Sequence, residues 1–134
     1  MRGSFFRGRV KFDQRSEEGP AADERYRGSM DTPVMVVPDL REISPMPTDK
    51  LGHITALKSP DVRVVILTFP AGHVMKDHAT PKTLLLQTLD GHVRLTVDGE
   101  VTEMVPGALM RLDPGVRHEV EAVGESRLKL TLVG

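Results

Sequence analysis

Glycine-containing turn signals recur along the second half of the chain and restrict its fold more than any other feature. After Pro60 they separate short β-branched runs: Pro70-Ala71-Gly72, Asp90-Gly91, Asp98-Gly99, Pro106-Gly107, Asp113-Pro114-Gly115 and Val123-Gly124. Turn signals spaced by roughly eight to twelve residues are typical of an all-β sandwich or barrel. Before them, five prolines between residues 33 and 60 exclude long helices, because each removes a backbone donor and constrains the residue that precedes it.

Alternating apolar and polar residues identify the strands. Val93, Leu95 and Val97 share one face of residues 92–98, and the same alternation occurs in residues 127–132. Asp-Gly between two such runs favours a two-residue hairpin, since both central residues must accept a positive φ. The pairs at 90–91 and 98–99 therefore predict a three-stranded meander of residues 83–89, 92–97 and 100–104.

The run 62–69 differs because it is apolar on both faces. Val64 and Ile66 lie on one face, and Val65 and Leu67 lie on the other. A strand of this kind needs a second cover, which either a second subunit or the chain's own tail over a closed sandwich would supply. We expect a homodimer.

Length and composition exclude several classes of protein. A chain of 134 residues suits one domain, and a formal net charge of -1 with 4% aromatic residues gives no basis for nucleic-acid binding. Cysteine is absent, so any metal must be bound by His, Asp or Glu. The longest apolar runs are far shorter than the ~18 to 20 residues that span a bilayer. We expect a cytoplasmic protein with a disordered charged tail over residues 1–30 and a β-barrel domain over residues 31–134.

Two motifs of glycine and histidine residues at fixed spacing occur among these predicted strands and turns. In the first, five residues separate Gly72 from His78, and Thr80, Leu84 and Gly91 follow at fixed intervals. In the second, Gly107 precedes the Asp113-Pro114-Gly115 turn, and His118 and Ala122 follow it. These motifs resemble those of the cupin superfamily, whose members are small double-stranded β-helix (jelly-roll) barrels. In the family, histidines stand at the positions of His78, Thr80 and His118, a glutamate at Leu84 and an asparagine at Ala122.

The resemblance implies a site inside the barrel at which His78 and His118 are two of the family's four metal ligands. Leu84 cannot coordinate a metal, and Thr80 is a weak donor. Two imidazoles would hold Fe, Mn, Ni or Zn only weakly compared with the three or four protein ligands usual for zinc or non-haem iron. Asp77 and His73 should face away from His78 by strand alternation, and His53, His73 and His92 are interpreted as structural or surface histidines.

The predicted pocket combines these polar residues with an aliphatic wall. Its residues are His78, Thr80, Leu84, Leu86, Leu95, Met110 and His118, with Val93 and Val116 as further wall candidates. An aliphatic cavity suits a small apolar or carboxylated ligand. No serine stands in a glycine elbow and no glycine-rich loop has a phosphate-binding pattern, so catalytic residues remain unassigned.

Three functions remain open at this point. The first is small-molecule binding by a degenerate two-histidine pocket with weak or absent metal binding. The second is a metal-dependent cupin enzyme of the dioxygenase or isomerase kind, with His78 and His118 as ligands. The third is a structural or interaction module whose pocket is vestigial.

Overall fold

The structure is a computed structural model that describes residues 33–46 and 49–134. The predicted disordered tail over residues 1–30 lies outside the described residues. The described part contains strands and no α-helix, and no helix there is long and apolar enough to cross a membrane. Its strands are β1 (Gly52–Lys58), β2 (Val62–Phe69), β3 (Val74–His78), β4 (Thr83–Asp90), β5 (Val93–Val97), β6 (Glu100–Met104), β7 (Leu109–Leu112), β8 (His118–Ala122) and β9 (Ser126–Val133).

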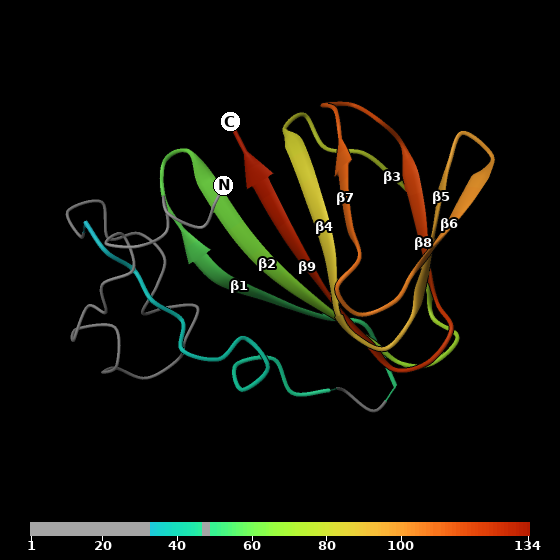
Figure 1. Ribbon diagram of the computed structural model, residues 1–134, viewed down its shortest axis with the longest axis horizontal. Helices are drawn as coiled ribbons and strands as arrows, with labels where there is room; N and C mark the ends of the chain where they lie inside the picture. The colour runs from blue at the N-terminus through green and yellow to red at the C-terminus, as the bar shows by residue number, and fades with distance from the viewer. Residues whose placement is uncertain (1–32, 47–48) are drawn as a thin grey trace.

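The strands form two antiparallel sheets (Figure 1). The five-stranded sheet has the order β1-β2-β9-β4-β7, and the four-stranded sheet has the order β3-β8-β5-β6. Strands that are neighbours in the chain often lie in different sheets, as in a jelly roll. The all-β jelly-roll prediction is confirmed.

The core lies between the inner faces of the two sheets. Leu84 and Leu86 of β4, Val93 and Leu95 of β5 and Leu128 of β9 are no more than 1% exposed. They alternate along their strands with more exposed residues, because successive side chains point to opposite faces of a sheet. Each leucine so buried stabilises the fold by about 1.5–3 kcal/mol.

The two Asp-Gly turns have different roles. Asp98 and Gly99 have φ values of 51° and 82°, and Val97 pairs with Glu100 across them, so the predicted two-residue hairpin between β5 and β6 is confirmed. The meander prediction is wrong at Asp90-Gly91. There β4 pairs with β7 and β9, whereas β5 pairs with β6 and β8, so this turn crosses from one sheet to the other.

Tertiary packing explains why Gly91 does not close a hairpin. Its φ is 86°, and a Cβ added there would overlap the backbone oxygen of Glu125 and Oγ of Ser126. The backbone N–H of His92 donates to Ser126 Oγ at 2.9 Å. The crossing is therefore fastened to the turn before β9, a contact between segments that are remote in sequence.

Both faces of β2 are covered within one chain. Val65, Leu67 and Phe69 belong to the core, and Ile66 on the opposite face is fully buried as well. On that outer face Arg127 Nε donates to the carbonyl of Ser44, at 2.9 Å, which ties the segment before β1 to β9. The burial of Ile66 thus requires no second subunit, and the homodimer stays a prediction.

Candidate functional site

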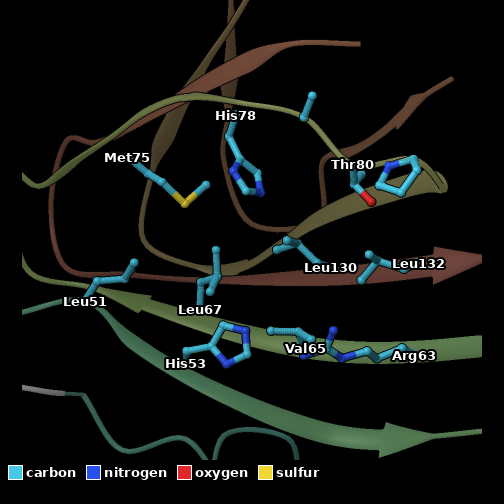
Figure 2. A pocket seen from close by; sticks show the side chains of 12 residues that line it. Leu51, His53, Arg63, Val65, Leu67, Met75, His78, Thr80, Leu130 and Leu132 are labelled. Carbon is cyan, nitrogen blue, oxygen red and sulfur yellow. The ribbon is translucent and has the colours of Figure 1, made fainter. Parts of the chain in front are cut away.

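A cavity of about 350 Å³ opens on the inner face of the five-stranded sheet (Figure 2). Strands β1, β2 and β9 form one wall, and β3 with the loop that follows it forms the other. The apolar lining consists mainly of Leu51, Val65, Leu67, Met75, Leu130 and Leu132. This volume lies in the range of small-molecule sites, and its lining is mostly aliphatic as such sites require.

Four polar side chains also line the cavity. His53 and Arg63 come from β1 and β2, whereas His78 and Thr80 come from the end of β3 and the loop after it. Figure 2 shows that these two groups project from opposite walls. No aspartate or glutamate is among the described residues that line the cavity. The polar part of the site therefore consists of neutral or positively charged groups.

A β-bulge in β3 decides which residues reach the cavity. Met75 pairs with Val120 and His78 pairs with His118, so one strand has an extra residue between the two pairs. Regular alternation would place Met75 and His78, three positions apart, on opposite faces. The bulge brings both to the cavity, and sequence alternation alone did not predict Met75.

His78 and His118 converge as a cross-strand pair. Their ring centroids are 5.7 Å apart, and the rings are perpendicular. His118 is only 1% exposed; its Nδ1 lies 3.2 Å from the carbonyl oxygen of Val116, while Nε2 is buried with no partner among the described residues. Donation from Nδ1 to this carbonyl places the proton on Nδ1 and leaves a lone pair on Nε2.

Electrostatics favour a neutral His118. Burial lowers the pKa of His118, and the nearby His78 lowers it further, whereas the Val116 carbonyl and Asp77 act in the opposite direction. A buried nitrogen with a free lone pair and no hydrogen-bond donor is costly to leave unsatisfied. His118 therefore places a buried acceptor beside His78, and His78 is the ring of the pair that lines the cavity.

The predicted site residues are only partly brought together. His78 and Thr80 line the cavity, and His118 lies directly behind His78. The residues predicted as an aliphatic wall do not line this cavity. Leu84, Leu86 and Leu95 are buried in the core, and Met110 packs against that core. They lie between the sheets beside β4, β5 and β7, away from the wall that β1 and β2 provide.

The residues that sequence reasoning missed come from β1, β2 and β9. Arg63, Val65 and Leu67 share the inner face of β2, and Leu130 and Leu132 share that of β9. The alternation within both runs is readable in the sequence. The sequence does not show that β2 pairs with β9, which is remote in the chain, and only this pairing joins the two inner faces into one wall.

The remaining histidines have individual surroundings. His53, interpreted as structural or exposed, is exposed and lines the cavity. The ring of His73 packs edge-on against Phe69 with centroids 6.0 Å apart. His92 Nε2 contacts Glu103 Oε1 at 2.5 Å, and this hydrogen bond is the largest cause of the lowered pKa of Glu103.

The donor set does not fit the metal that the resemblance implies. At the four family positions only His78 and His118 carry metal-binding groups, and Leu84 is buried in the core. Asp77 is not among the residues that line the cavity, and it pairs with Arg117 Nε at 2.7 Å. The described residues contain no group of three or more His, Cys, Asp or Glu residues placed to hold a metal ion. A tight site normally needs three or four such ligands.

Comparison with known proteins identifies the family. No curated protein matches this chain in sequence. Among solved structures, an RmlC-like cupin from Desulfovibrio desulfuricans is 22% identical with a TM-score of 0.68, covering 75% of this chain and 97% of its own. A cupin superfamily protein from Desulfitobacterium hafniense is 15% identical with a TM-score of 0.66, covering 70% and 86%. At these identities the likeness shows the fold. The family model for the cupin domain matches residues 65–134, more than half of the sequence, and the chain therefore belongs to the cupin domain family.

Proposed function

We propose that this cupin binds a small molecule in the cavity between β3 and the β1-β2-β9 wall, without depending on a metal ion. The observation that carries the proposal is the position of His78. Its imidazole enters an aliphatic cavity of about 350 Å³ and is backed by the buried, unpartnered Nε2 of His118. A bound molecule with one polar atom near His78 could form a hydrogen bond with this exposed ring.

The residues have distinct tasks in binding. The leucines of β9 and the valine and leucine of β2 would bury the apolar part of the ligand, which supplies most of the binding free energy. His78 and Thr80 would orient the ligand by hydrogen bonds from the opposite wall. His118 lies behind His78, where it limits the orientations open to that ring.

Nuclear magnetic resonance of the metal-free, untagged protein tests the proposal with a library of small aliphatic alcohols, amides and acids. We expect binders that shift the amide signals of Met75, His78 and Thr80. Leu130→Trp should fill the cavity and abolish these shifts. Leu109→Trp is the matched control, because Leu109 is 65% exposed and lies outside the cavity. A library that gives no binder, or binders unaffected by Leu130→Trp, would refute the proposal.

A further inference from the structure

We infer that the ligand of this cavity is a small aliphatic carboxylate whose charge is neutralised by Arg63. The inference rests on the proposed function and adds to it the chemical class of the ligand. Three observations support it: the position of Arg63, the absence of an acidic partner for Arg63 among the described residues, and the charges of the cavity lining.

Arg63 occupies a position on β2 that otherwise belongs to the apolar inner face. It lies two residues before Val65 on the same side of the strand, and it pairs across the sheet with Leu132 of β9. Its guanidinium Nη2 donates to Thr55 Oγ1 of β1 at 3.5 Å, a long hydrogen bond. Arg63 is an exposed residue, so its charge lies beside the cavity lining and in contact with solvent.

Arg63 differs from the other described arginines in having no described acidic partner. Arg41 and Arg127 both pair with Asp90. The other arginine pairs are Arg94 with Glu103 and Glu121, Arg111 with Asp113, and Arg117 with Asp77. The ion pairs among the described residues include none with Arg63. Arginine forms a planar fork of donors that matches a carboxylate with two parallel hydrogen bonds. Among the described residues no carboxylate competes with a ligand for these donors.

The surroundings of Arg63 favour an anion. The described lining contains no carboxylate, and His53 lies on the same wall as Arg63. An anion placed there meets no repulsion from a carboxylate of the lining, and it is attracted by the exposed, solvent-screened guanidinium of Arg63.

The shape of the cavity favours a carboxylate with an apolar body. A single arginine neutralises one negative charge, and Leu130, Leu132 and Val65 beside it offer an aliphatic surface. At ~30 Å³ per water-sized atom, a cavity of about 350 Å³ accepts about twelve non-hydrogen atoms. The acid would place its carboxylate at Arg63 and its hydrocarbon chain over β9, and a polar atom at its other end would meet His78 on the opposite wall (Figure 2).

Calorimetric titration of the untagged protein with matched probes tests the inference. The probes are hexanoate, its neutral analogue hexanamide, and inorganic phosphate. We expect hexanoate to bind about three- to fivefold more tightly than hexanamide, which corresponds to about 0.6–1 kcal/mol, because Arg63 is exposed. Arg63→Gln should remove this preference, so that hexanoate binds no more tightly than hexanamide. Arg111→Gln, which alters an exposed arginine outside the cavity, should bind both probes as the wild type does.

The outcomes separate this inference from the proposed function. Equal binding of hexanoate and hexanamide by the wild type would overturn the carboxylate inference while the binding function stands. A hexanoate preference that survives Arg63→Gln would overturn the role of Arg63. Phosphate that competes for the site more strongly than hexanoate would show a phosphate ligand in place of a carboxylate. If neither organic probe nor any library compound binds, the proposed function itself fails.

Discussion

His118 and His78 face each other across the β3–β8 pair with perpendicular rings and centroids 5.7 Å apart. One ring is fully buried and keeps an unpartnered nitrogen, while the other is exposed and lines the cavity. The pair therefore lies where the protein core borders the candidate site. Its effects on pH dependence and on metal binding can be measured separately.

The stability of the fold should decrease as the pH falls, because burial lowers the pKa of His118. The unfolded state takes up a proton near the ordinary histidine pKa of about 6.5, while the folded state resists protonation until lower pH. The contribution of His118 is thus fully present above pH ~6.5 and is lost as the pH falls through its lower, folded-state pKa. Urea unfolding between about pH 8 and pH 5 should show a smaller loss for His118→Gln than for the wild type. An equal loss of stability in both proteins would show that His118 does not cause the pH dependence.

Metal binding should be weak, because only two imidazoles remain at the family positions. Protein purified without a histidine tag, then dialysed against Fe, Mn, Ni or Zn and desalted, should retain well under one metal ion per chain by elemental analysis. His92→Ala serves as the control for a surface histidine paired with Glu103. One ion per chain that is lost in both His78→Ala and His118→Ala, but kept in His92→Ala, would favour the metal-dependent enzyme.

Gly91→Ala should destabilise the fold far more than Gly99→Ala. Both glycines have positive φ, 86° and 82°, so each alanine incurs a backbone penalty of about 1–2 kcal/mol. Only at Gly91 would the new Cβ also overlap Glu125 and Ser126, whereas nothing lies near it at Gly99. We expect a total loss above about 4 kcal/mol at Gly91, the range of severe steric or packing defects. Chemical denaturation measures both, and equal losses would argue against the close approach of the two turns.

Arg127→Met should destabilise the protein by about 1.5–3 kcal/mol, the usual value for hydrogen bonds to charged groups. Arg127, only 16% exposed, donates to Asp90 at 2.8 Å and to the Ser44 carbonyl at 2.9 Å, so it links the segment before β1 to the sheet. Arg111→Met breaks a well-exposed pair with Asp113 and should cost under about 1 kcal/mol. Urea unfolding measures the loss of stability in each variant. Amide exchange at Ser44 should accelerate in Arg127→Met alone, and unchanged exchange would show that Arg127 does not anchor the segment.

Much of the fold was predictable from local sequence. Alternation in residues 92–98 and 127–132 identified β5 and β9, and Asp98-Gly99 identified the hairpin after β5, because a positive φ at both residues is a local requirement. The convergence of His78 and His118 followed from a motif resemblance. Local pattern did not predict the sheet crossing at Gly91, since both a hairpin and a crossing accept the same Asp-Gly pair.

The sequence by itself determined the class of fold, its family and the two histidines of the candidate site, because turn chemistry, strand alternation and motif spacing depend on neighbouring residues. Only the tertiary structure decided which residues form the cavity wall. The β2–β9 pairing and the bulge in β3 place Arg63, Met75 and Leu130 in the cavity wall. Leu84, Leu86 and Leu95 lie in the core instead. Strand partners and registers are selected by the packing of the whole core, and that selection involves residues far apart in the chain.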